Sequence, residues 1–336
     1  MNALDRFQRQ LAGRSIDRPL NFSIFMAFAA HLIERPLADY YLDHNVLCEA
    51  NYAVVNQFGV DLVQAISDPY REAHDFGAQI DFPPDGLPIC TAPRLQHERD
   101  LATLEKPLVH VGPRMSDRLR AIERFRKDVG GELPIMGWVE GALAEAADLR
   151  GVQTLLMDLV YRPAWVHELL EICCEVAIDF ALAQIEAGAD IIGLGDAIAS
   201  QVSPAMYSEF AAPYERRVFD AVYAAGAIPR LHICGDITHL LPQIEAVGPS
   251  ILDLDWMVDI KDALDALPED VLVCGNVDPV SVMLKATPEE VSSATLQCLE
   301  AGGSRLIAGA GCEIPDGTPF ENLHAQRKSL ATFLGH

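Results

Sequence analysis

Two side chains that can bind a metal stand two residues apart in the stretch LHICGD, at His232 and Cys234. Alternate side chains of an extended strand point to the same face, so the imidazole and the thiol would lie side by side. Zinc prefers a neutral imidazole and thiolates as ligands. A His-x-Cys pair alone is a weak signal, because cysteine is also common in ordinary protein cores.

A third candidate ligand, Cys312, follows the apolar stretch LIAGAG near the end of the chain. The carboxyl ends of parallel strands meet at one edge of a barrel, which would bring this thiol to the His-x-Cys pair. Three protein ligands that leave one position open are typical of catalytic rather than structural zinc. An inert core position for Cys312 is the alternative, and the spacing alone leaves both interpretations open.

Three carboxylates also end predicted strands: Glu140 in GWVEG, Asp196 in GLGD and Asp255 in LDLD. Each could complete the metal coordination or support it, and Glu140 or Asp196 could protonate or orient a leaving group. The alternatives are a helix or loop cap for Asp196 and an ordinary polar strand end for Asp255. Trp138 and Trp256 could wall a planar pocket, although packing is the default for an indole.

The elements that must position these residues follow from the hydrophobic pattern. Apolar stretches that alternate with helical patterns predict eight parallel strands, and a chain of this kind without a glycine-rich phosphate motif favours an α/β (β/α)8 TIM barrel. The predicted strands are 18–25, 59–65, 133–141, 188–196, 228–235, 250–255, 271–278 and 304–311. The helices predicted between the later strands are 203–226, 237–248, 260–270 and 287–303.

We expect a single TIM-barrel domain over residues 1–336, since half of the 336 residues are hydrophobic and can fill one large core. Residues 1–17 are predicted to form an amphipathic N-terminal helix. Residues 66–132 are rich in Pro, Asp and Arg, which predicts an irregular insertion with a loop and a hairpin over the barrel mouth.

The composition restricts the possible partners and compartment. The formal net charge is −24, and so acidic a surface repels the phosphate backbone of nucleic acids. No run of 18 apolar residues and no signal peptide are found, so no membrane association is expected. Eight cysteines are too few for a disulfide scaffold in a chain of this length, which predicts a cytoplasmic protein with reduced thiols.

With these residues placed, the chain resembles the uroporphyrinogen decarboxylase superfamily, and within it the cobalamin-linked methyltransferase branch. The resemblance covers about residues 15–330 and is carried by AGADIIGLGDAIAS, VSPAMYSEFAAPY, LHICGD, VLVCGNVDP and GAGCEIPDGTPFENL. It implies a zinc ion at the barrel mouth, bound by His232, Cys234 and Cys312. The decarboxylases themselves are a poorer match, because their basic first-strand stretch corresponds here to the apolar RPLNFSIFMAFAAHL.

The resemblance further implies methyl transfer between a small molecule and cobalamin. No Asp-x-His-x-x-Gly stretch occurs, so the cobalamin is expected on a separate corrinoid protein. The stretch GWVEGALAEAADLRG is similar to the O-demethylase-type group, so a methyl ether such as a methoxyarene is the expected donor. The alternatives are methyl transfer from a corrinoid protein to a thiol, a metal-free decarboxylase, and a corrinoid- or haem-related binding barrel without enzymatic activity. A homodimer is left open.

Overall fold

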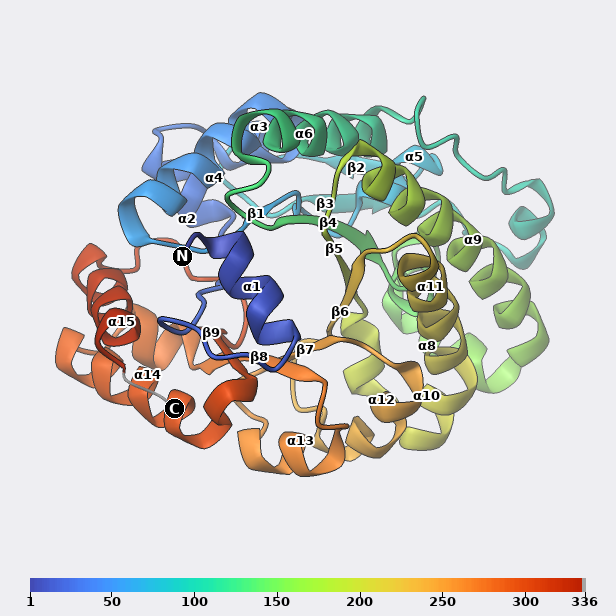
Figure 1. Ribbon diagram of the computed structural model, residues 1–336. Coiled ribbons are helices and arrows are strands. Elements are labelled where there is room, and N and C mark those ends of the chain that lie inside the picture. The colour runs from blue at the N-terminus through green and yellow to red at the C-terminus, as the bar shows by residue number, and fades with distance from the viewer. Residues whose placement is uncertain (334–336) are drawn as a thin grey trace.

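The computed structural model describes residues 1–333, which form a curled sheet of parallel strands surrounded by helices (Figure 1). The sheet has seven strands in the order β1-β4-β5-β6-β7-β8-β9, all parallel. These strands are β1 (Val63–Gln64), β4 (Ile135–Glu140), β5 (Ile191–Gly195), β6 (Ile228–His232), β7 (Ile251–Leu254), β8 (Leu272–Val277) and β9 (Leu306–Ala310). The predicted TIM-barrel class is thereby confirmed.

The eighth predicted strand, 18–25, is not a regular strand, although it closes the ring. Phe22 N donates to Ala308 O at 2.9 Å on one side, and Asp61 N donates to Asn21 O at 2.9 Å on the other. The amide of Ser23 donates instead to the side chain of Asn21, at 3.1 Å. This local bond takes a donor from the ladder, so only isolated bridges form where we predicted a strand.

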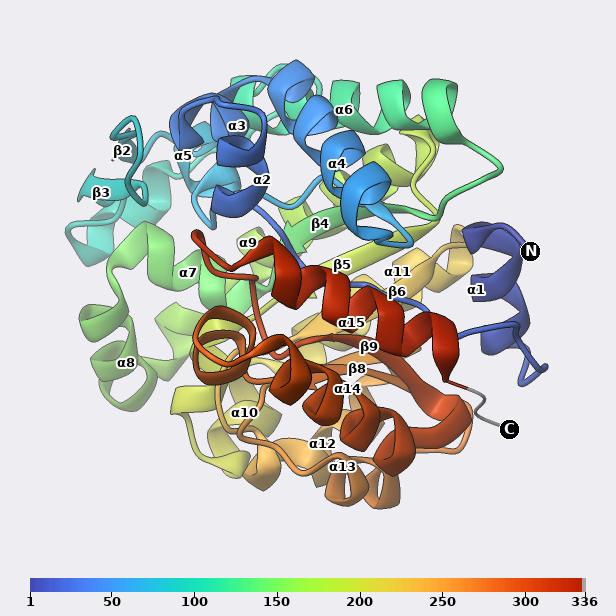
Figure 2. The same cartoon turned by 90° about the vertical axis from the view of Figure 1, so that its left-hand side faces the viewer.

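Helices pack around the outside of the sheet, where their apolar faces cover the strands (Figures 1 and 2). The α-helices of residues 1–333 are α1 (Ala3–Leu11), α2 (Ala27–Leu32), α3 (Leu37–Leu42), α4 (His44–Phe58), α5 (Arg71–Asp75), α6 (Pro113–Val129), α7 (Ala142–Arg150), α8 (Val152–Tyr161), α9 (Pro163–Ala187), α10 (Pro204–Phe210), α11 (Ala212–Ala224), α12 (Leu241–Val247), α13 (Ile260–Ala266), α14 (Pro288–Gly302) and α15 (Phe320–Thr332).

The N-terminal helix α1 lies across the amino ends of the strands, in front of the ring in Figure 1. Leu4 N donates to Glu132 O at 2.9 Å, and the side-chain amide of Gln10 donates to Leu306 O at 2.9 Å. The helix predicted over 1–17 is therefore present but ends at Leu11. The carboxyl ends of the strands, where the candidate residues lie, open at the other end of the barrel.

The insertion predicted over 66–132 is only partly irregular. It contains the expected hairpin, β2 (Gln79–Asp81) and β3 (Ile89–Ala92), which lies at the end of the barrel opposite α1 (Figure 2). Residues 113–129, however, form the long helix α6, which we did not predict. Its residues Arg114 and Arg118 are buried, and each forms an ion pair with an aspartate. We did not predict a helix here because arginines usually indicate exposed positions.

The helix predicted over 203–226 is divided into α10 and α11. Pro213 stands in the first turn of α11 and has no amide hydrogen to donate to the preceding turn, so one helix cannot continue through it. The helix predicted over 237–248 likewise begins with a 3-10 turn, Thr238–Leu240, before α12. These differences change the outer layer and leave the strands in place.

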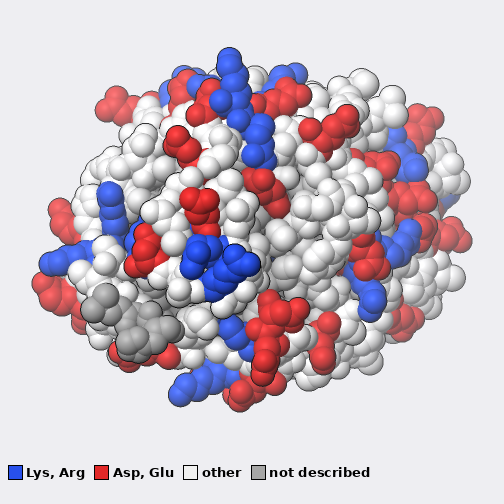
Figure 3. All heavy atoms as spheres, viewed as in Figure 1, with Lys and Arg blue, Asp and Glu red and all other residues white. Residues whose placement is uncertain are grey.

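Acidic and basic side chains are interspersed over the face that carries α1 (Figure 3). No continuous basic surface is visible on this face, in agreement with the acidic composition. Within residues 1–333, no helix has both the length and the apolar character needed to cross a membrane.

Candidate metal centre

His232, Cys234 and Cys312 converge at the carboxyl end of the barrel. His232 Nε2 lies 3.1 Å from Cys234 Sγ, and the two sulfur atoms are 3.8 Å apart. The three potential ligand atoms all lie within 4.8 Å of one another. The strand ends that the sequence predicted to meet therefore bring the three predicted ligands into one cluster, which we call the His-Cys-Cys cluster.

Two glycines allow the loops that carry the thiols to approach so closely. Gly235, directly after Cys234, has a φ of +95°, a conformation that favours glycine. Gly311, directly before Cys312, packs so tightly that a Cβ there would lie 2.5 Å from the backbone nitrogen of Trp256. A side chain at Gly311 would displace the Cys312 loop from the β7 end against which it packs.

Asp253 supports the cluster from the neighbouring strand, and sequence analysis missed it. Its Oδ2 accepts a hydrogen bond from His232 Nδ1 at 2.8 Å, and its Oδ1 accepts one from Arg230 Nε at 2.8 Å. His232 and Asp253 are register partners in β6 and β7. The alternation LDLD was the available signal, since it places Asp253 on the same face as Asp255.

The position of Asp253 fixes the role of the imidazole. With Nδ1 turned to the carboxylate, Nε2 faces the thiols and is the ring nitrogen that would bind a zinc ion. Burial alone would raise the pKa of Asp253, but Arg230 and His232 more than offset this and hold the pKa below its usual range. The carboxylate is therefore ionised and can stabilise positive charge on the ring.

The two thiols of the cluster ionise differently. The hydrogen bond with Cys312 and burial raise the pKa of Cys234, whereas Cys312 ionises readily. A hydrogen bond from Cys234 is the largest cause that lowers the pKa of the Cys312 thiol to about 4, and His232 lowers it further. Only thiolates bind zinc strongly. The donor set of one oriented imidazole and two thiols, one of them readily ionised, fits a zinc ion.

Asp255 positions one ligand loop and does not enter the cluster. Its Oδ2 accepts a hydrogen bond from Gly235 N at 2.9 Å, which ties the turn after Cys234 to the end of β7. Its Oδ1 is buried and has no partner among the described residues. Within residues 1–333, no carboxylate joins the three ligands as a fourth member of the group.

Glu140 lies at the carboxyl end of β4, two strands from the His-Cys-Cys cluster. Glu140, Gly195 and His232 are successive register partners across β4, β5 and β6. Because Gly195 has no side chain, the indole of Trp138 fills the space, with its ring 5.6 Å from the imidazole and its Nε1 3.2 Å from Glu140 Oε1. A Cβ at Gly195 would lie 3.0 Å from the indole and 3.3 Å from Glu140 Oε2.

The carboxyl of Glu140 is part of a buried acidic group. Burial raises its pKa to about 8, and Glu72 adds to the rise, while Arg71 opposes it with a hydrogen bond of 3.0 Å. Arg71 also lies 3.4 Å from Glu72, so one guanidinium serves two carboxyls. At neutral pH the Glu140 carboxyl consequently holds its proton, and it could act as an acid.

Asp196 is not brought to the cluster. It is fully buried against the start of α7, where a Cβ at Gly141 would lie 2.5 Å from its Oδ2. Burial raises the pKa of Asp196 well above its usual range, and Glu215 of α11 raises it further. Its carboxyl oxygens have no hydrogen-bond partner among the described residues, and it makes no side-chain cap to α7 or to the 3-10 turn Ala197–Gln201 that follows it.

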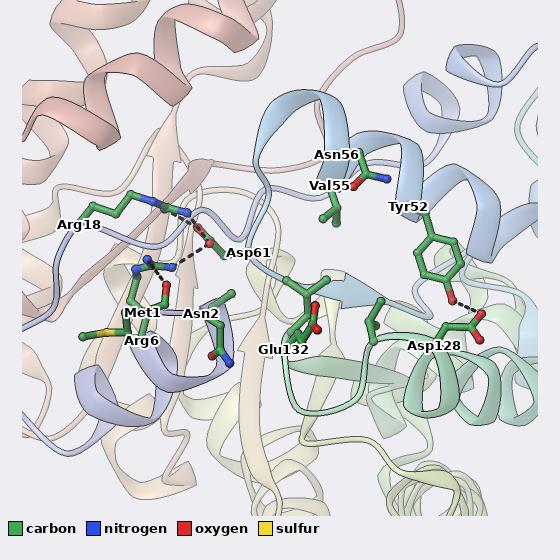
Figure 4. A pocket seen from close by; sticks show the side chains of 13 residues that line it. Met1, Asn2, Arg6, Arg18, Tyr52, Val55, Asn56, Asp61, Asp128 and Glu132 are labelled. Atoms are coloured by element: carbon green, nitrogen blue, oxygen red, sulfur yellow. Dashed lines mark hydrogen bonds and ion pairs between the residues drawn. The ribbon is translucent and has the colours of Figure 1, made fainter.

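A pocket of about 540 Å³ lies at the amino end of the barrel, beside α1 and far from the cluster (Figure 4). Several of its polar groups are paired with one another: Arg6 and Arg18 both bind Asp61, and Tyr52 donates to Asp128. No member of the His-Cys-Cys cluster lines it.

The chain is similar to known proteins over most of its length. A family model described as uroporphyrinogen decarboxylase (URO-D) matches residues 2–332. The methylcobamide:CoM methyltransferase MtbA of Methanosarcina mazei is 31% identical over 280 residues, which cover 82% of this chain and 80% of that protein. A methylated-thiol–coenzyme M methyltransferase of the same organism is 29% identical over 299 residues, which cover 88% and 76%. The solved structure of a methyltransferase from Methanosarcina mazei matches 98% of both chains with a TM-score of 0.89 at 22% identity, which supports the fold.

Proposed function

Because the chain belongs to the uroporphyrinogen decarboxylase family, as its sequence resemblance predicted, we propose that it is a zinc-dependent methyltransferase of that family. It would transfer a methyl group between a small molecule and the cobalamin of a separate corrinoid protein. The observation that carries the proposal is the convergence of His232, Cys234 and Cys312 within 4.8 Å at the barrel mouth. A metal-free decarboxylase would give no reason for such a cluster.

His232, Cys234 and Cys312 would hold the Zn²⁺, which supplies a Lewis acid for a thiolate or phenolate at one open position. Asp253 orients the imidazole and increases its basicity. Arg230 balances the charge of Asp253 inside the barrel. Asp255 keeps the Cys234 loop in place through the amide of Gly235.

The corrinoid would have to approach from outside, because the barrel interior is filled. Arg230 occupies the core beneath the cluster and contacts Met136, Cys274 and Phe22. A macrocycle cannot enter this packed space. A partner protein that presents its cobalamin at the mouth is the arrangement that this packing allows.

Glu140 supports a methyl ether as the donor. Demethylation of an aryl ether produces a phenolate, which a nearby acid can protonate. The raised pKa of Glu140, about 8, keeps this carboxyl protonated near neutral pH. Glu140 is therefore proposed as the acid that assists departure of the oxygen, with Arg71 and Trp138 holding it in position.

A thiol is the second candidate for the small molecule, as the acceptor of a methyl group from the corrinoid protein. It is favoured by the two relatives from Methanosarcina mazei, whose names specify CoM and a methylated thiol. The same three metal ligands would suit a thiolate equally well. The two candidates therefore differ in the direction of transfer and share the metal centre.

One pair of reactions separates these candidates. The purified, zinc-loaded chain is mixed with a corrinoid protein in the cob(I)alamin state and a methoxyarene, and the cob(I)alamin absorbance is followed. Loss of absorbance that requires the methoxyarene supports demethylation. If instead only thiols take the methyl group from the methylated corrinoid protein, the donor assignment is wrong and the methyltransferase assignment holds. If neither reaction occurs with any corrinoid protein, the proposed function is wrong.

A further inference from the structure

The chain exposes a large aromatic side chain directly beside the metal ligands. Trp256 follows the end of β7 and is 51% exposed, and its neighbour Met257 is 44% exposed. The chain has three tryptophans, of which Trp138 is buried in the barrel and Trp165 donates its Nε1 hydrogen to Glu98 O on the outer surface. Burial in contact with neighbours is the usual state of an indole, so its exposure at the mouth needs a reason.

The loop that carries Trp256 is held in a defined conformation. Val258 N donates to Asp255 O at 3.0 Å and closes a turn around Trp256 and Met257. The side-chain amide of Asn276, on β8, donates to Asp255 O at 3.3 Å and to Val258 O at 2.6 Å. The two exposed side chains therefore stand on a fixed loop, so little conformational entropy of the backbone would be lost on binding.

The same loop contacts both loops that carry the cysteine ligands. Asp255 Oδ2 accepts from the amide of Gly235, next to Cys234. The backbone nitrogen of Trp256 packs against Gly311, next to Cys312. Trp256 and Met257 therefore stand on a loop that adjoins both cysteine-bearing loops of the His-Cys-Cys cluster.

We propose that Trp256 and Met257 form the contact surface for the corrin ring of the partner protein. The inference rests on the proposed function and specifies which residues recognise the partner. A corrin is a flat macrocycle with an apolar face, and an exposed indole on a rigid loop offers a planar apolar surface of matching chemistry. A thioether beside it can adapt its shape to the edge of the ring. In this position the loop holds the corrin face toward the open side of the metal centre.

Free methylcobalamin is the probe for a binding test. We expect Trp256→Ala to weaken its binding, measured by isothermal titration calorimetry, roughly tenfold, which is the effect typical of losing one aromatic stacking partner. We also expect methylcobalamin to quench the fluorescence of the wild-type chain strongly and that of Trp256→Phe weakly. Trp165→Phe is the matched control, because it removes an indole outside the mouth and should preserve both the affinity and the quenching.

The variants also separate this inference from the proposed function. Trp256→Ala should retain one zinc per chain and its unfolding temperature, and should raise the KM for the corrinoid protein while the KM for the small molecule stays constant. If the wild-type chain transfers methyl groups and Trp256→Ala binds methylcobalamin as tightly, the proposed contact surface is wrong. If the substitution raises only the KM for the small molecule, Trp256 binds that substrate instead. If the wild-type chain neither transfers methyl groups nor binds methylcobalamin, the failure lies with the proposed function.

Discussion

His232 donates its Nδ1 hydrogen to Asp253 across two neighbouring strands, at 2.8 Å, so that its other ring nitrogen faces two cysteine thiols. The aspartate is fixed in turn by Arg230, which is buried in the barrel core. The orientation of one candidate metal ligand is thus set by a charge pair that lies inside the barrel. The His-Cys-Cys cluster and the barrel core are parts of one hydrogen-bonded network.

Removing one thiol should abolish zinc binding. We expect Cys312→Ala to contain less than one zinc per chain, because a histidine and a single thiolate rarely retain zinc against buffer. Elemental analysis of the purified variant measures this directly. Cys90→Ala, at a half-buried cysteine of β3 outside the cluster, should keep the wild-type metal content. Full retention of zinc by Cys312→Ala would show that Cys312 is not a ligand.

The support that Asp253 provides should appear as zinc affinity. We expect Asp253→Asn to lower the affinity about 10- to 100-fold, the range typical for the partner of a metal-binding histidine. Competition with a chromogenic chelator measures the change. Since this variant leaves Arg230 without its counter-charge, the double variant Arg230→Met/Asp253→Asn serves as a check on folding. An unchanged affinity in a folded variant would contradict the role of Asp253.

Glu140 should make stability depend on pH with a defined sign. Its pKa is about 8 in the folded chain and about 4.5 when exposed, so between these values the unfolded chain releases a proton that the folded chain keeps. The free energy of unfolding of the wild type should therefore fall relative to that of Glu140→Gln as the pH rises from 4.5 to 8. Urea denaturation of both proteins over this range measures the difference.

Other titratable groups surround Glu140 and also make the stability of both proteins depend on pH. Arg71 and Glu72 contact it, and Glu145 and Asp148 of α7 lie near enough to affect its charge. All of these groups are present in both proteins, so their own titration largely cancels in the difference. Two parallel curves would mean that Glu140 has the same pKa in the folded and the unfolded chain, and the acid role proposed for it would then be lost.

The space on β5 at Gly193, between its register partners Trp138 and Arg230, should tolerate no additional side chain. A Cβ at Gly193 would overlap the six-membered ring of Trp138, so we expect Gly193→Ala to lower the free energy of unfolding by about 1–3 kcal/mol. Gly309→Ala is the matched control in β9, because a Cβ there would meet only ordinary contacts, the nearest at 3.5 Å from Cys274 Sγ. Equal stability of the two variants would show that Trp138 can move without cost.

Much of the architecture could be predicted from local patterns. The alternation of apolar stretches with helical patterns located the seven sheet strands and hence the barrel, since strand and helix periodicities are local properties. The same reasoning brought His232, Cys234 and Cys312 together, because each follows the carboxyl end of a strand and all such ends meet at one face. Residue type and strand position predicted that the three side chains meet. Their assignment as zinc ligands came from the family resemblance, because the spacing alone left an inert core position open for Cys312.

Other features depended on contacts that no local pattern contains. Asp196 and Asp255 end strands just as the ligands do, yet one is buried against α7 and the other binds the Gly235 amide. Helix α6 was missed because its arginines occupy buried positions, and Arg114 among them pairs with Asp68, which is distant in sequence. The sequence by itself determined which residues stand at the carboxyl ends of the strands. The tertiary structure decided which of these side chains join the His-Cys-Cys cluster, which support it by hydrogen bonds and which are buried elsewhere. Burial and hydrogen-bond partners are set only when distant strands and helices pack together.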